Sequence, residues 1–368
     1  MEVVFGGDFY PGRRWEEKII NNAASIWSDE VVSFFHEADL RIVNLETPLT
    51  VSNIPIKKIG PNLKCHPNVV KTLNHANIDL VTIANNHIYD FGDKGLKDTI
   101  KILEDNKINY IGVGKDKNTA ENAIFEKEDV VFLNYSHNEW GAATDKTSGF
   151  NSYSIIGITN KIKHYKKLKK CVCLILHRGH EHFSFPSPNM VEEFRFFVDN
   201  GADLIITHHS HFYSGFEKYK NGHIFYGLGN MLFDSSTKDE RWFESFLLKI
   251  NFENKKITDL KILPINHKFE NGKISIGNDE KFFKNQNLLN QIIKNNKELE
   301  KKWLDYASLM ELSYLLMLQN KSKYILSLVK RAPFLKKYFL RESNNKHTLQ
   351  NYFNCEAHYE AIKEILNK

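Results

Sequence analysis

The sequence is poor in cysteine, and its cysteines form no redox pattern. Its 368 residues include four cysteines, and no two of them make a CxxC pair: Cys65, Cys171, Cys173 and Cys355. This scarcity excludes a small secreted scaffold held by disulfides. We therefore predict buried thiols in a reducing compartment.

Long hydrophobic runs are also missing. No apolar stretch approaches the roughly 20 residues that a membrane-spanning helix needs. The opening residues, MEVVFGGDFY, show a strand pattern at once, without the basic and apolar regions of a signal peptide. No Gly-Lys-Ser/Thr motif is present to cradle nucleotide phosphates. These absences predict a cytoplasmic protein without a P-loop.

Excess positive charge is confined to one segment. The net charge is +5, but residues 321–341 carry seven Lys/Arg and no acid, so the rest of the chain sums to about −2. A general nucleic-acid-binding surface is therefore not expected. The basic residues alternate with apolar ones around Pro333, which is typical of amphipathic surface helices. One interpretation is ordinary packing with the lysines in water, and the other is peripheral contact with an anionic membrane or polymer precursor.

Short apolar runs alternate with amphipathic segments over most of the chain. Strand patterns such as RIVNLE (41–46), CVCLIL (171–176) and ADLIIT (202–207) are separated by helical patterns such as GLKDTIKILEDN (95–106). This alternation predicts an α/β fold with βαβ units. The pattern changes near residue 285, so we predict an α/β domain over 1–284 and a helical region over 285–368 packed on it. Within that region, residues 303–319 are apolar nearly all round and predict a buried helix.

Several predicted strands end in side chains that can bind metals. The strand-end residues are Asp8, Glu46, Asn86, His177 and the pair His209 and His211. Each has an ordinary interpretation alone, as a turn residue, a solvated strand end or a packed histidine. Together they supply carboxylate, amide and imidazole ligands suited to one or two divalent ions of manganese, zinc or iron. Because functional residues of α/β folds collect at the carboxyl ends of strands, we expect them to converge.

These motifs, in this order, resemble the CapA family of bacterial poly-γ-glutamate capsule-synthesis proteins, a branch of the calcineurin-like metallophosphoesterases. The resemblance covers about residues 2–265. The stretches that carry it are GGDFYPGR (6–13), ADLRIVNLETPLT (38–50), LVTIANNHIYDFGDKGLKDTIKIL (80–103), IGVGKDKNTAENA (111–123), LHRGHEHFSFPSP (176–188) and GADLIITHHSHFYSGFEKYKNGHIFYGLGNMLFD (201–234). It implies a metallophosphoesterase-like α/β/β/α sandwich.

The resemblance also implies roles for individual residues. Glu46 would bridge two ions, and the remaining metal ligands would be Asp8, Asn86, His177, His209 and His211. His87 would assist at the substrate, and Glu181 matches a family position beside the ligands or the substrate. Arg178 stands where relatives often have Trp, and its guanidinium fork suits a phosphoryl group. Tyr10 replaces the histidine of the usual Asp-x-His motif, so one ion has one ligand fewer.

Together these features predict a metal-dependent hydrolase of a phosphate ester, either a monoester or a diester, in capsule or surface-polymer biosynthesis. The expected substrate is a phosphorylated or anionic small molecule or polymer precursor. Two alternatives remain open: a non-catalytic accessory component of a capsule-assembly complex, and a ligase-type activity in polymer synthesis.

Overall fold

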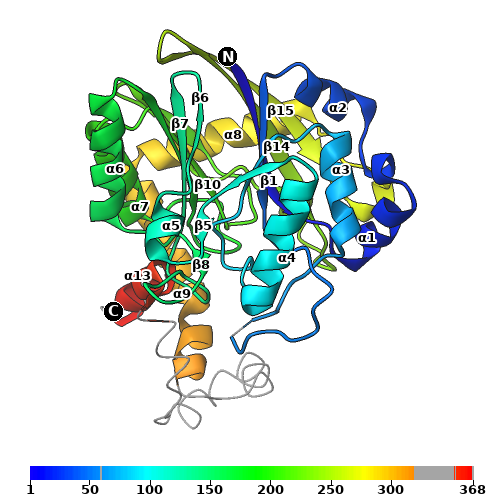
Figure 1. The fold of residues 1–368 in the computed structure, drawn as a ribbon. Helices are drawn as coiled ribbons and strands as arrows, with labels where there is room; N and C mark the ends of the chain where they lie inside the picture. The colour runs from blue at the N-terminus through cyan, green and yellow to red at the C-terminus, as the bar shows by residue number, and fades with distance from the viewer. Residues whose placement is uncertain (59, 319–351, 353, 367–368) are drawn as a thin grey trace.

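The computed structural model describes residues 1–58, 60–318, 352 and 354–366. Two β-sheets lie face to face, and helices cover the outer face of each (Figure 1). The predicted α/β/β/α sandwich and the helical C-terminal region are thus both confirmed.

The first sheet contains the strand that includes Asp8 and the strands that precede Glu46 and Asn86. Its order is β16-β15-β14-β1-β2-β3-β4, with β13 also paired to β1. Strands β1 to β4 are parallel, β13 is parallel to β1, and β14 is antiparallel to it. The bounds are β1 (Glu2–Tyr10), β2 (Leu40–Leu45), β3 (Leu80–Thr82), β4 (Asn109–Ile111), β13 (Asn230–Phe233), β14 (Glu244–Glu253), β15 (Lys256–Asn266) and β16 (Ser275–Ile276).

The second sheet contains the strands that precede the histidine clusters. Its order is β11-β12-β10-β9-β7-β6, with antiparallel strands at both edges. Every residue of β9 is buried, as expected of a central parallel strand covered on both faces. The bounds are β6 (Phe125–Lys127), β7 (Val130–Ser136), β9 (Cys171–His177), β10 (Leu204–His208), β11 (Phe216–Tyr219) and β12 (Gly222–Phe225); a separate pair comprises β5 (Val113–Gly114) and β8 (Gly149–Phe150).

Three hydrophobic layers hold the sandwich together. The central layer joins the sheets, with the ring of Phe5 packed 6.3 Å from that of Phe132. The outer layers bury the apolar faces of the helices on each sheet.

The helices over the first sheet are α1 (Gly12–Asn21), α2 (Asp29–His36), α3 (Val70–His75) and α4 (Gly92–Asp105). Over the second lie α6 (Ile155–Lys167) and α7 (Pro188–Asp199), and α5 (Lys117–Glu121) lies beside β5. Short 3-10 helices are η1 (Ala23–Ile26), η2 (Pro67–Val69), η3 (Glu240–Phe243) and η4 (Phe269–Asn271).

A close backbone approach positions the strand that carries Asp8. A Cβ atom on Gly7 would lie 1.9 Å from the carbonyl oxygen of Gly229, so only glycine fits there. The amide of Asp8 then donates to the same Gly229 oxygen at 3.1 Å. This contact fixes the carboxyl end of β1 against the segment that leads into β13.

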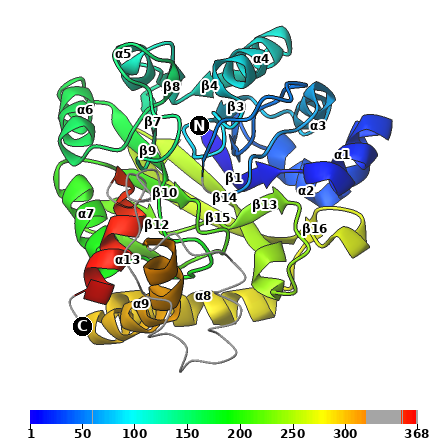
Figure 2. The ribbon, with the colours of Figure 1, turned by 90° about the horizontal axis from the view of Figure 1, so that it is seen from below.

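The last three helices of the described chain pack against the sandwich. They are α8 (Asp279–Lys294), α9 (Asn296–Leu318) and α13 (Glu356–Leu366). Seen from below, α9 and α13 lie in front of the ends of the strands (Figure 2). Helix α9 agrees with the helix predicted over 303–319, but it is not buried all round, because Leu309 is 75% exposed. No helix among the described residues is both long and apolar enough to cross a membrane. The predicted basic segment 321–341 lies outside the described residues.

Candidate metal centre

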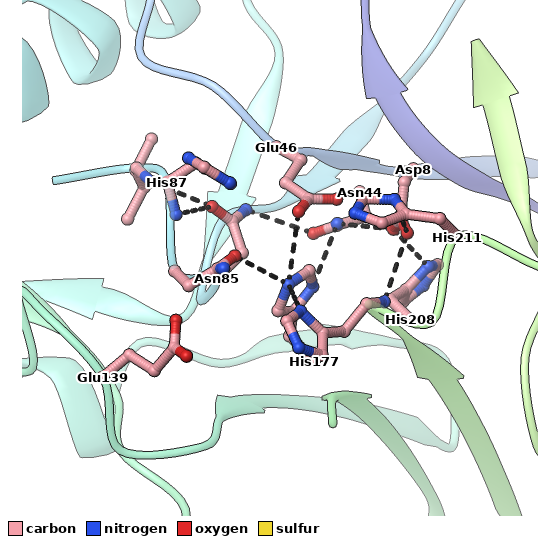
Figure 3. A network of polar contacts seen from close by, with 12 residues as sticks. Asp8, Asn44, Glu46, Asn85, His87, Glu139, His177, His208 and His211 are labelled. Atoms are coloured by element: carbon pink, nitrogen blue, oxygen red, sulfur yellow. Dashed lines mark hydrogen bonds and ion pairs between the residues drawn. The ribbon is translucent and has the colours of Figure 1, made fainter. Parts of the chain in front are cut away.

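The predicted ligands come together where the two sheets meet (Figure 3). Asp8 lies in β1, Glu46 directly follows β2, and His177 is the last residue of β9. His177 Nε2 lies 3.0 Å from Asn86 Oδ1 and 3.5 Å from Glu46 Oε1. The convergence expected from the strand ends is therefore present in the structure, while the role of each residue as a ligand stays a prediction.

Two groups of ligand atoms share Glu46. Glu46, His177 and His209 form one group, and Asp8, Glu46 and His211 form the other; within each group the atoms lie within 4.8 Å of one another. All of these side chains are buried. A carboxylate common to two groups is the arrangement that a pair of bridged divalent ions requires.

Glu46 is the residue that most needs a cation. Its side chain is fully buried, and neither carboxylate oxygen has a hydrogen-bond partner among the described residues. Burial raises its pKa well above the ordinary value, and the nearby Asp8 carboxylate adds to the increase. Leaving a buried acceptor unsatisfied costs about 1–3 kcal/mol, and more for a charged group. The donor set thus fits divalent metal ions, which would supply the missing positive charge.

Asp8 has the opposite electrostatic environment. Burial acts to raise its pKa, but His208, whose Nδ1 lies 2.9 Å from Asp8 Oδ1, brings it below the ordinary value. Asn44 donates to Asp8 Oδ1 at 2.8 Å, and the amide of His209 donates to Oδ2 at 3.2 Å. Asp8 is therefore held as an anion. The sequence interpretation missed the contacts of Asn44, which lies two residues before Glu46, and of His208, which directly precedes His209.

The histidines present neutral nitrogens to the centre. Burial lowers the pKa of His177 and His209 well below the usual range, so both imidazoles are unprotonated and able to bind metal. His209 Nδ1 lies 3.2 Å from His177 Nε2. His209 and His211 have φ angles of 86° and 62°, in the left-handed region that non-glycine residues adopt infrequently. This backbone turns both rings toward the sheet ends.

His87 lies beside the ligands and contacts a buried ion pair. Its Nδ1 is 2.7 Å from Asp90 Oδ2, and Asp90 forms an ion pair with Lys58. Lys58 Nζ is also 3.2 Å from His87 Nδ1. The sequence interpretation included His87 but missed Lys58 and Asp90. In the sequence, the one indication of this contact is the position of Asp90 three residues after His87.

The remaining predicted residues occupy different positions. Arg178 is 1% exposed, and its guanidinium donates to Glu193 at 2.9 Å and to Glu360 at 2.8 Å. It also stacks on the ring of Tyr153, with 4.7 Å between the guanidinium carbon and the ring centroid. These contacts favour a structural role over the predicted phosphoryl-binding role. Glu181 is exposed and lines a cavity beside the centre.

A cavity of about 300 Å³ opens beside the centre. The α/β domain supplies polar residues to its wall, whereas the C-terminal helices supply mostly aromatic and apolar ones. Its polar lining includes Lys58, Asn86, His87, Glu181 and His209, and the helical side includes Tyr306, Leu309, Met310, Tyr314 and Cys355. A substrate placed there would contact the metal ligands on one side and an apolar wall on the other.

Comparisons with known proteins agree with the motifs. A family model described as "Bacterial capsule synthesis protein PGA_cap" matches residues 2–235. "Capsule biosynthesis protein CapA" of Bacillus anthracis is 29% identical over 281 residues, covering 72% of this chain and 67% of that protein. A Mycobacterium tuberculosis protein named as a probable polyglutamine synthesis accessory protein is 24% identical over 212 residues, covering 53% of this chain and 56% of that protein. A solved dimetal phosphatase from Danio rerio covers 55% of this chain and 88% of its own, at 9% identity. Its TM-score against this chain is 0.32.

Proposed function

The chain belongs to the bacterial capsule synthesis protein family PGA_cap, and we propose that it is a metal-dependent hydrolase of phosphate esters in capsule or surface-polymer biosynthesis. The observation that carries this proposal is the unpartnered, buried carboxylate of Glu46, shared by two groups of ligand atoms. A phosphorylated precursor in the adjacent cavity would lie next to that carboxylate.

The six strand-end residues would hold the ions. His177, His209 and Asn86 would hold one ion and Asp8 and His211 the other, with Glu46 shared between them. Divalent ions bound there would polarise a phosphoryl oxygen and lower the pKa of a bound water. Because Tyr10 replaces the usual histidine, the ion at Asp8 and His211 would be the more weakly held.

His87 would transfer a proton to the leaving group. With Asp90 on its Nδ1, the other ring nitrogen is available to a substrate oxygen. A neighbouring carboxylate that fixes the imidazole tautomer is the usual support for a general acid or base. Lys58 lines the cavity and can donate to phosphoryl oxygens, which makes it a better placed cation than Arg178.

The first experiment is metal analysis of the purified chain followed by a hydrolysis screen. The screen would use phosphorylated sugars, nucleotides and phosphodiesters with manganese, zinc or iron supplied. We expect divalent metal in the protein and metal-dependent release of phosphate or alcohol, and we expect Glu46→Ala to lose both the turnover and the metal of the Glu46 centre. A chain that contains no metal and shows no turnover with any of these ions would contradict the proposal.

The competing function is a non-catalytic component of a capsule-assembly complex. Tyr10 in place of a metal ligand supports it, as does the accessory role in the name of the mycobacterial relative. Stable metal binding without turnover, together with binding of an anionic polymer precursor, would favour this alternative. The cytoplasmic location and the peripheral membrane contact of residues 321–341 stay predictions.

A further inference from the structure

A second cluster of potential ligands lies beside the candidate centre, where the loop after β7 meets the start of α13. His137, Glu139 and Cys355 offer ligand atoms that all lie within 4.8 Å of one another. We propose that these three residues, together with His358, bind a zinc ion that is separate from the ions of the Glu46 centre.

His137 is a buried imidazole whose ring nitrogens have no hydrogen-bond partner among the described residues. Its side chain is fully buried, and neither ring nitrogen is hydrogen-bonded within the described part of the chain. Glu139 Oε2 lies 3.8 Å from Nε2, which is beyond hydrogen-bonding distance. Its backbone is fixed, because the amide donates to the carbonyl oxygen of His177 at 3.1 Å. A metal ion would satisfy a ring nitrogen that the fold holds in place without a partner.

The C-terminal helix brings the other ligands to this point. Cys355 Sγ lies 3.7 Å from Glu139 Oε1, and His358 Nε2 lies 3.5 Å from the same oxygen. The Tyr314 hydroxyl lies 2.8 Å from His358 Nδ1. A hydrogen bond at one ring nitrogen orients the other toward a metal, as outer partners of zinc-binding histidines do.

The donor set identifies zinc as the best-suited ion. One thiolate, two imidazole nitrogens and one carboxylate oxygen match the four-coordinate sulfur, nitrogen and oxygen ligation that zinc prefers. A thiolate and a carboxylate together neutralise the charge of a divalent ion. Binding would release the Cys355 proton to solvent.

This cluster adjoins the Glu46 centre but shares no ligand with it. The ring of His137 packs edge-on against that of His209, with 4.3 Å between centroids. An ion held by the loop and by α13 would fasten the C-terminal helix to the α/β domain and form part of the cavity wall. It is independent of the proposed hydrolysis.

Cobalt(II) substitution tests the proposal directly. Cysteine ligation gives a near-ultraviolet thiolate-to-cobalt charge-transfer band, and none of the six residues of the Glu46 centre is a cysteine. We expect the band in the wild-type chain, its loss in Cys355→Ala, and its retention in Cys65→Ala, which removes another buried thiol. The band should also persist in Glu46→Ala, so failure of this site and failure of the hydrolase proposal are distinguishable.

Zinc titration provides the quantitative check. Cys355→Ala should lower bound zinc by one ion per chain, and Tyr314→Phe should weaken zinc binding about 10–100-fold by releasing His358. Absence of the charge-transfer band in the wild-type chain, or its survival in Cys355→Ala, would overturn the proposal and leave only a buried polar cluster.

Discussion

At the scale of single residues, Glu46 and Asp8 show how one buried site keeps two carboxylates in different states. Asp8 contacts His208 Nδ1 at 2.9 Å and has an amide donor on each oxygen, whereas Glu46 has no hydrogen-bond donor among the described residues. The pKa of Asp8 is lowered and that of Glu46 is raised. Of the two carboxylates, Glu46 is therefore the one that a bound cation would stabilise most.

We predict that Glu46→Ala removes more bound metal than Asp8→Ala. Glu46 belongs to both groups of ligand atoms, whereas Asp8 belongs to one. Elemental analysis should find the Glu46 variant depleted at both positions and the Asp8 variant still holding the ion between His177 and His209. Glu126→Ala, at an exposed residue, is the control. Equal metal content in the two site variants would count against a bridging Glu46.

His87→Ala should retain its metal and slow hydrolysis about 10²–10⁴-fold, the usual contribution of a general acid or base. The reason is that His87 contacts Asp90 and the cavity and belongs to neither group of ligand atoms. Turnover and metal content would be measured together, with His36→Ala on an exposed helix face as the matched control. Loss of metal from the His87 variant would instead identify this residue as a ligand.

At the scale of elements, buried ion pairs connect the second sheet to the C-terminal helix. Arg178 follows β9, Glu193 lies in α7 and Glu360 lies in α13. Both carboxylates accept hydrogen bonds from the Arg178 guanidinium. The end of β9 places His177 in the centre, and Arg178 directly after it docks α13, which forms part of the cavity wall.

Arg178→Met should lower the free energy of unfolding by about 3–5 kcal/mol, because it leaves two mostly buried carboxylates without their cation. Denaturant unfolding measures the effect. Lys101→Ala, which breaks the exposed pair with Asp105, should cost less than about 1 kcal/mol. If Arg178 binds substrate instead, its variant would raise KM and leave stability near that of the Lys101 variant.

At the scale of the whole molecule, buried neutral histidines make the fold sensitive to acid. His267, at the end of the long hairpin, is fully buried, and burial lowers its pKa to about 3. Above its unfolded pKa of about 6.5 the residue is neutral in both states. As the pH falls below 6.5 the unfolded chain binds a proton that the folded chain cannot, so stability decreases until the pH reaches about 3.

We therefore predict that this histidine contributes a loss of about 1.4 kcal/mol per pH unit between pH 6.5 and pH 4. The unfolding free energy of the wild-type chain and of His267→Leu would be measured across that range. The unfolding free energy of His267→Leu should fall with decreasing pH less steeply than that of the wild-type chain, by about 1.4 kcal/mol per pH unit. Parallel slopes would mean that His267 takes up its proton equally in both states.

Much of the candidate centre could be predicted, because most of its residues lie at the carboxyl ends of strands that the sequence pattern indicates. The apolar runs that end at His177 and at Thr207-His208 are adjacent parallel strands, and their carboxyl ends necessarily meet at one edge. Lys58 could not be found in this way. It lies in a loop with no periodic signal, and its partner Asp90 is identified only by the fold.

The sequence by itself determined the alternation of strands and helices, the polar strand ends and the family, because these depend on local periodicity and on motif order. Tertiary structure decided which charges pair. Arg178 meets Glu360 across 182 residues, and Cys355 meets Glu139 across 216. No local pattern specifies such contacts, because they arise only when α13 packs over the end of the sandwich. The same packing surrounds Arg178, the predicted phosphoryl-binding residue, with two carboxylates and brings a second group of potential ligands beside the first.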